Sequence, residues 1–195
     1  RLIAHVYTEL NMHAEAIREL KDVLEQDPNY HFERLLLAIL YENRKEYQKA
    51  MAELAKIPEN SKLYTSAQIH IGYSLRHLKR WEQAEGQLLQ TLETARDDGD
   101  ITRIHRILAE VHAAQKRYRV GLRLLDEAIA AHPDLTDLLE AKSNLLFEAG
   151  RTTEAIATLE KALEDKPRDI SLWYALGALH ERMGKIPESL QAMRE

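Results

Sequence analysis

The chain has 195 residues, of which 45% are hydrophobic and 30% charged, and its formal net charge is −5. This composition is typical of a folded globular protein. The acidic balance argues against a nucleic-acid binder, and the absence of cysteine excludes disulfides, Cys-ligated zinc and thiol catalysis. No apolar run approaches the ~20 residues that span a bilayer. We therefore expect a soluble protein without membrane insertion, in either the cytoplasm or the periplasm.

Six similar units follow one another along the chain. We expect them at about residues 1–30, 31–64, 65–101, 102–135, 136–169 and 170–195. Each unit holds two helix-period patterns joined by a short polar turn such as "ENRKE", "RHLKR" or "EAGRT". Pro28, Pro133 and Pro167 end the second predicted helix in three units, since proline cannot continue a helix.

The units are aligned by a small residue that is followed four places later by Leu or Met. The small residues are Ala16, Ala50, Ala84, Gly121, Ala155 and Ser189, and the large ones are Leu20, Leu54, Leu88, Leu125, Leu159 and Met193. Both series advance by 34, 34, 37, 34 and 34 residues. A third series lies earlier in each unit, at Tyr7, Tyr41, Leu75, His112, Leu146 and His180. An apolar-small pair precedes most members of this third series.

The pattern resembles the tetratricopeptide repeat, a 34-residue unit with W-x2-L-G-x2-Y, then small and apolar residues and a late proline. The sixth unit fits best, with Trp173, Leu176, Gly177 and then His180 at the tyrosine position. The resemblance implies an all-α fold, a right-handed superhelical solenoid of antiparallel helix pairs. It also implies protein or peptide binding. We interpret these four residues as packing positions rather than a site.

Two units depart from the regular spacing. The second unit ends early, at Ile57-Pro58, and "PENS" predicts a turn with a new helix starting near Ser61. The third unit carries three extra residues, which we assign to a loop at "RDDGD" (96–100) because Asp-Gly favours a turn. These irregularities either alter the superhelical twist or are tolerated changes in loop length.

Neither end of the sequence offers the polar capping element with which repeat arrays normally finish. The chain begins at Arg1, and Glu195 stops before the second helix of the last unit is complete. We therefore expect a fragment of a longer protein. Its uncapped termini would then allow an end-to-end homodimer.

We find no candidate catalytic, cofactor-binding or metal-binding site. His70 and His77, like His105 and His112, are seven residues apart, which is about 10 Å along a helix and too far to share one metal ion. There is no phosphate-binding glycine loop or nucleophile motif. We interpret the neighbouring pairs of acidic residues as solvent-exposed charges on helix surfaces. We expect a protein that is not an enzyme and needs no cofactor.

The candidate binding surface is the stripe of the first helices that faces the concave groove. Counting places from the unit starts, the second, fifth, ninth and twelfth places lie about 130° from the core positions. The stripe is apolar early, then basic, then acidic. The predicted partner-binding residues are Phe32, Leu35, Ile39, Ile69, Tyr73, Arg76, Arg103, Arg106, Asn144 and Tyr174. Leu35, Ile39 and Ile69 have an alternative interpretation, in which they pack against neighbouring first helices.

The leading hypothesis is a scaffold that binds a peptide, helix or loop of a partner in this groove. Arg103 and Arg106 would hold an acidic segment, since guanidinium groups pair with carboxylates in a bidentate way. The alternatives are a structural self-association module, or the adaptor region of a larger enzyme or envelope-assembly factor. The Ala/Glu/Leu/Arg-rich style suggests a bacterial origin. Nucleic-acid binding ranks last because of the acidic charge.

Overall fold

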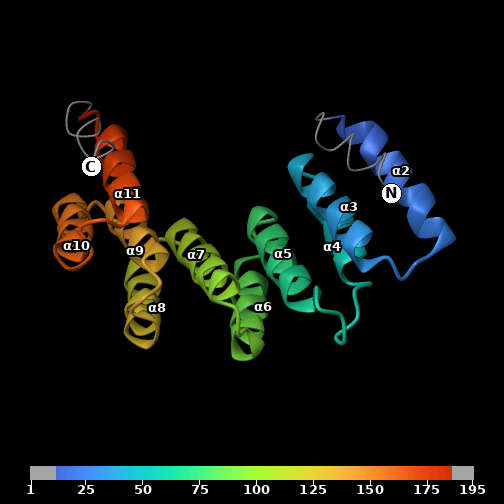
Figure 1. Cartoon of the computed structure of the whole chain (residues 1–195), viewed down its shortest axis with the longest axis horizontal. Coiled ribbons are helices and arrows are strands. Elements are labelled where there is room, and N and C mark those ends of the chain that lie inside the picture. The colour runs from blue at the N-terminus through green and yellow to red at the C-terminus, as the bar shows by residue number, and fades with distance from the viewer. Residues whose placement is uncertain (1–11, 186–195) are drawn as a thin grey trace. The chain divides into compact units, whose positions relative to one another are not determined.

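The structure is a computed structural model that describes residues 12–185. This part of the chain contains ten α-helices and no strand. Contacts divide the chain into two compact units, residues 1–96 and 97–195, and each is described by itself below. Figure 1 shows the order of the helices along the chain.

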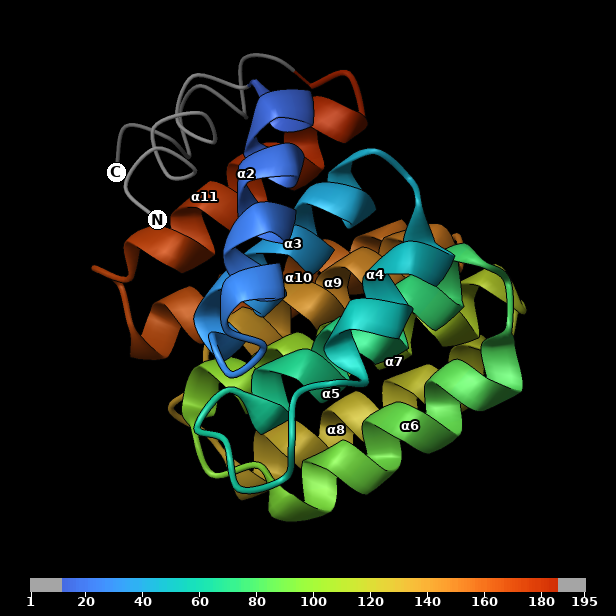
Figure 2. The same cartoon turned by 90° about the vertical axis from the view of Figure 1, so that its right-hand side faces the viewer.

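From residue 12 onward, the first compact unit contains one unpaired helix and two helix pairs. They are α2 (His13–Gln26), α3 (His31–Asn43) with α4 (Tyr47–Leu54), and α5 (Tyr64–His77) with α6 (Trp81–Thr94). Figure 2 shows α5 and α6 side by side, and α4 also packs on α5. The second compact unit contains α7 (Asp98–Ala114) with α8 (Tyr118–Ala131), α9 (Asp137–Glu148) with α10 (Thr152–Asp165), and α11 (Ile170–Arg182). The all-α fold and the helix pairs of the four middle repeats are confirmed, while the first helix predicted for the first repeat and the second helix predicted for the last repeat lie outside the described residues.

The small and large positions of the repeat form the core, as predicted. Ala50, Ala84 and Ala155 are fully buried, and so are the leucines four places later. Gly121 takes the same place because a Cβ there would lie 2.8 Å from Leu145 Cδ2. Packing of a small residue against a large one lets the helices approach closely, which explains why both series persist. Ser189 and Met193 lie outside the described residues, as does Tyr7.

The turn that follows the first helix of a repeat has the same geometry in all five described cases. The residue at the fifteenth place of the repeat has a positive φ, between 56° and 77°. These residues are Lys45, Lys79, Lys116, Gly150 and Gly184. At Lys116 the backbone N–H donates to the Ala113 carbonyl (2.8 Å), and the next N–H, of Arg117, donates to the His112 carbonyl (2.8 Å). This pair of bonds is a Schellman motif, which satisfies the last carbonyls of a helix.

The irregular segments differ in part from the predictions. α4 ends at Leu54, which confirms the early end of the second unit, but α5 begins at Tyr64 rather than near Ser61. The predicted loop at 96–100 is wrong, because α7 already begins at Asp98 and includes Gly99. The Asp97 carboxylate caps this helix by accepting a hydrogen bond from the Asp100 N–H (3.0 Å). Acidic side chains in a first turn are favoured by the helix dipole, so the extra residues lengthen α7 instead of forming a loop.

Candidate functional site

The hollow surface of the second compact unit lies along its first helices, α7, α9 and α11. Two adjoining cavities, of about 430 and 320 Å³, line up along them. They share Arg106, Ala141 and Asn144. The smaller cavity uses the N-terminal half of each helix, and the larger one uses the C-terminal half. The three helices therefore run in the same direction beside one continuous hollow.

Small side chains give this hollow its depth, and charged or aromatic side chains form its walls. Ala109, Ala113 and Ala141 line it from α7 and α9. The other lining residues include Arg106, Glu110, Asp137, Glu140, Asn144, Glu148, Tyr174 and Arg182. Most of these residues stand at the places that the sequence assigned to the groove stripe. Glu148 and Arg182 were not predicted, because they lie at the ends of their helices, beyond the twelfth place.

Arg182 is held in position by two residues of α9. Its Nη1 donates to Asn144 Oδ1 at 2.7 Å, and its guanidinium carbon lies 4.4 Å from the centre of the Phe147 ring. A guanidinium stacked on a ring and hydrogen-bonded at one edge is oriented before any ligand arrives. The predicted residues Arg106, Asn144 and Tyr174 all line the hollow, and Tyr174 is 63% exposed. Arg103, by contrast, is half-buried and lines neither cavity.

The corresponding stripe of the first compact unit is largely packed. Leu35 and Ile69 are only 8% and 0% exposed, and Ile39 packs against the core that contains Leu37 and Leu40. The prediction that Leu35 and Ile69 face a partner is therefore wrong, and the packing alternative holds for both. Their aliphatic side chains gain more from burial than from facing water. Phe32, in contrast, is 50% exposed.

An aromatic cluster joins the first residue of α4 to the C-terminal half of α5. The Tyr47 ring stacks on His77 with centroids 4.6 Å apart, and Tyr73 meets His77 edge-on at 4.4 Å. Arg76 lies over Tyr73, 5.3 Å from the ring centre, and its Nη2 is 2.8 Å from His77 Nε2. Burial, followed by the charge of Arg76, lowers the pKa of His77. Tyr73 and Arg76 are thus engaged with neighbouring side chains.

A buried carboxylate lies next to this cluster. The side chain of Glu42, on α3, is bound to two residues of α5: its Oε2 is 2.7 Å from His70 Nδ1, and its Oε1 accepts from Ser74 Oγ at 2.8 Å. Buried carboxylates are costly unless they are hydrogen-bonded, so these contacts tie the two helices together. His70 therefore has a structural role in the first compact unit, which the sequence alone did not indicate.

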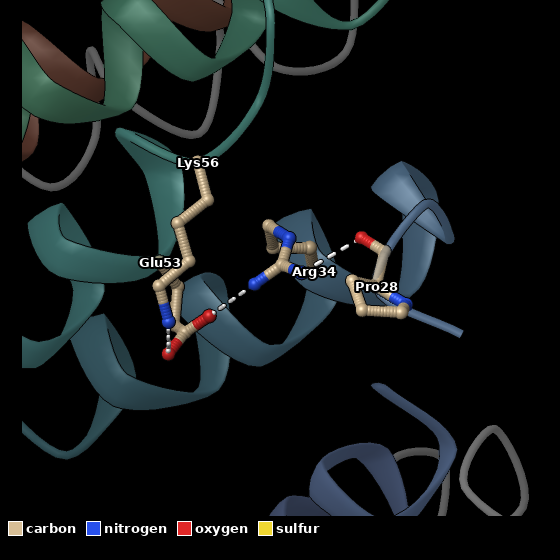
Figure 3. A network of polar contacts seen from close by, with 4 residues as sticks. All are labelled: Pro28, Arg34, Glu53 and Lys56. Carbon is tan, nitrogen blue, oxygen red and sulfur yellow. Dashed lines mark hydrogen bonds and ion pairs between the residues drawn. The ribbon is translucent and has the colours of Figure 1, made fainter. Parts of the chain in front are cut away.

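A second polar network joins consecutive segments of the first compact unit (Figure 3). Arg34 is buried, and its Nη1 donates to Glu53 Oε2 at 2.6 Å while its Nη2 donates to the Pro28 carbonyl at 2.8 Å. Lys56 Nζ pairs with the other oxygen of Glu53 at 2.8 Å. The network ties the loop after α2 to α3 and α4, and so stabilises this unit, and its four residues also line a cavity of about 510 Å³.

Among the described residues, no three His, Asp or Glu side chains are arranged to hold a metal ion. In the same range of residues, no helix is both long enough and apolar enough to cross a bilayer. His112 is fully buried, as its core position predicted.

Comparison with known proteins shows which families and proteins this chain is similar to. Family models for the tetratricopeptide repeat match residues 7–68, and for the TPR repeat residues 144–184. The protein is 24% identical over 195 residues to the TPR repeat-containing protein YpiA of Bacillus subtilis, covering 98% of this chain and 45% of YpiA. The curated relatives that match most of this chain are longer proteins, and the chain spans less than half of their length.

Solved structures show the same fold. A tetratricopeptide repeat protein from Parabacteroides merdae superposes with a TM-score of 0.72 at 17% identity, over 98% of this chain and 73% of that one. YrrB, described as a TPR protein with an unusual peptide-binding site, has a TM-score of 0.52 at 17% identity, over 89% and 88% of the two chains. The repeat spacing, the helix pairs and these matches agree, and the chain belongs to the tetratricopeptide repeat family.

Proposed function

We propose that this protein is a non-enzymatic scaffold that binds a segment of a partner protein in the hollow along α7, α9 and α11. The observation that carries the proposal is the junction of the two cavities at Arg106, Ala141 and Asn144. A hollow with a small-residue floor and converging polar groups is a typical binding site. Tetratricopeptide repeat proteins are generally interaction scaffolds, and the similar YrrB has a peptide-binding site.

The walls supply both an apolar and a charged contribution to binding. Tyr174 and Ile170 are 63% and 82% exposed and line the smaller cavity. An exposed tyrosine can anchor a peptide at a small entropic cost. Arg106 and Arg182 would pair with an acidic side chain of the partner. We place the acidic contact on Arg106 and Arg182 rather than on Arg103, because Arg103 lines neither cavity.

Selection from a library of random 12-residue peptides tests the proposal on the full chain. We expect selected peptides to lose at least tenfold in affinity when Arg106→Glu or Tyr174→Ala is introduced, as measured by fluorescence anisotropy. Arg119→Glu is the matched control, because Arg119 is an exposed residue of α8 that lines neither cavity. Circular dichroism checks that helicity is kept. Selected peptides that bind all three variants equally would contradict the proposal.

In the first compact unit, Phe32, Tyr73 and Arg76 are proposed as secondary partner contacts. Phe32 is the most exposed of them, so Phe32→Ala is the variant that tests this unit in the same assay. A partner that contacts only the hollow would be insensitive to it.

Self-association through the chain ends remains the alternative. The ends lie outside the described residues, so this hypothesis depends on the sequence pattern alone. Light scattering on the chain extended by one repeat at each end separates the two hypotheses: a dimer that disappears on extension is an effect of the ends. An adaptor role within a larger enzyme or envelope-assembly factor would be visible in the complete reading frame.

A further inference from the structure

The charges along the hollow of the second unit alternate in sign. At the N-terminal end of α9 the walls carry Asp137 and Glu140, and at the C-terminal end they carry Glu148 together with Glu110 of α7. Between these ends lies Asn144, which holds Arg182 at 2.7 Å and lines both cavities with Arg106. The order along the hollow is therefore acidic, basic, acidic.

The spacing of these groups matches an extended chain. Glu140, Asn144 and Glu148 follow one another at four-residue steps, which place them about 6 Å apart along the helix axis. In an extended peptide, alternate side chains point to the same side and lie about 6.7 Å apart. Three alternate residues of an extended segment can therefore face Glu140, Asn144 and Glu148 in turn.

We propose that the partner segment is an extended peptide with the pattern basic-x-acidic-x-basic, which lies along α9 in this hollow. Its central carboxylate pairs with Arg106 and Arg182, and its two flanking cations pair with Glu140 and Glu148. This inference rests on the proposed function and adds the charge order of the partner. It replaces a uniformly acidic segment, because the carboxylates at both ends of the hollow would repel one.

The depth of the hollow supports side-chain insertion at the central position. Ala109 and Ala141 are small and line the larger cavity beside Asn144, where longer side chains would close it. The Asn144 and Phe147 contacts also fix the Arg182 guanidinium. A carboxylate placed there meets a preorganised donor, which reduces the entropic cost of binding.

Three labelled peptides that differ only in their central five residues test the charge order. The cores are Lys-Thr-Glu-Thr-Lys, Lys-Thr-Lys-Thr-Glu, which has the same composition, and Glu-Thr-Lys-Thr-Glu, with identical flanking sequences that contain one tyrosine. We expect the first to bind at least tenfold more tightly than either of the others by fluorescence anisotropy. The difference should shrink as salt rises, because the charges are exposed. Equal binding of all three, or of the first two, would overturn the inference.

A charge swap gives the decisive control. Glu148→Lys should weaken the binding of Lys-Thr-Glu-Thr-Lys at least tenfold. The variant should instead prefer a peptide with a carboxylate facing residue 148, which is Lys-Thr-Glu-Thr-Glu or its reverse, Glu-Thr-Glu-Thr-Lys. Glu127→Lys on α8 is the matched surface change and should alter neither affinity. If library peptides bind in an Arg106-dependent way but show no alternating charge, the proposed function stands and this inference fails. If no peptide binding depends on the hollow, both fail.

Discussion

Arg34 and Trp173 occupy the fourth place of their repeats, and each donates a hydrogen bond to the carbonyl of the proline six residues earlier. The bond from Arg34 Nη2 to Pro28 measures 2.8 Å, and the bond from Trp173 Nε1 to Pro167 measures 2.9 Å. A guanidinium and an indole thus make the same hydrogen bond at equivalent positions. Each fixes the loop that leads into a first helix, since the carbonyl after a helix end needs a donor.

The fourth place also makes a second recurring contact, with the twenty-third place on the following helix. In one unit the pair is Arg34 with Glu53, at 2.6 Å, and in the next it is Gln68 with Gln87, at 2.8 Å. Both pairs are separated by 19 residues. An ion pair and an amide pair therefore connect the two helices of their units at equivalent positions.

This equivalence predicts a strong coupling between Arg34 and Glu53. Arg34→Gln and Glu53→Gln should each cost about 1–3 kcal/mol in the free energy of unfolding, because each breaks a largely buried ion pair. The cost stays within this range because Glu53 keeps its contact with Lys56 and Arg34 keeps its bond to the Pro28 carbonyl. The double substitution should recover about 1–3 kcal/mol of the summed loss, because it recreates the amide pair found at residues 68 and 87. Urea unfolding of the four proteins measures the cycle. Strictly additive losses would contradict it.

The left-handed residues of the turns give a second prediction. Lys116 has a φ of 56° and Gly150 a φ of 77° at the same place of successive repeats. Because a side chain in this conformation costs about 1 kcal/mol relative to glycine, Lys116→Gly should raise the free energy of unfolding by roughly that amount. Gly150→Ala should lower it by a similar amount, although no atom would contact the added Cβ within 4 Å. The two proteins are compared with the parent by urea unfolding, and a change of the same sign in both would refute the assignment.

Residue spacing was sufficient to predict the helix pairs and the core. Ala50 and Ala84 must be small, and Leu54 and Leu88 must fill the same volume, so a constant packing need leaves a constant pattern. The sequence indicated a packing role for Trp173 at the fourth place but not the polar contacts made there, because five different residue types stand at this place, among them Arg34, Gln68 and Trp173. The left-handed place escaped notice, because lysine replaces the glycine that normally marks it.

The groove was predictable only in part. Spacing fixes the direction in which a side chain leaves its helix, and this was enough to bring Arg106, Asn144 and Tyr174 to one hollow. It does not fix how close the neighbouring element comes. At the fifth place Arg106 is exposed, while Leu35 and Ile69 at the same place are buried. Glu148 and Arg182 were missed because the stripe was counted only to the twelfth place.

A pair of helical glycines tests the close packing of α5 on α6. A Cβ at Gly72 would lie 2.5 Å from Leu88 Cδ2, whereas one at Gly86 would have no atom within 4 Å. Gly72→Ala should therefore lower the free energy of unfolding by about 1–3 kcal/mol through overpacking. Gly86→Ala should raise it by roughly 0.5–1 kcal/mol, since alanine favours a helix interior. Thermal unfolding followed by circular dichroism measures both, and a stabilised Gly72→Ala variant would show that the two helices are not in close contact there.

His105 stands at the fourth place of its repeat and makes the stability of the second compact unit depend on pH. Its side chain is buried, and its Nδ1 has no hydrogen-bond partner within residues 12–185. Burial, followed by the charge of His132, lowers its pKa below the ordinary value of 6.5. The unfolded chain accordingly binds this proton more readily than the folded one. The contribution of His105 to stability is complete above pH 6.5 and declines as the pH falls below that value, by at most about 1.4 kcal/mol per pH unit.

His105→Leu should remove this part of the pH dependence, because Leu139 occupies the same place of the next repeat without a titrating group. The measurement is the free energy of unfolding in urea at pH 7.5, 6.5, 5.5 and 5.0 for both proteins. Other groups, including His77, titrate in both proteins, so the difference between the two curves isolates His105. We expect that difference to grow in favour of the leucine variant as the pH falls from 7.5 to 5.0. A difference that stays constant over this range would show that the folded protein takes up the proton at His105 as readily as the unfolded chain does.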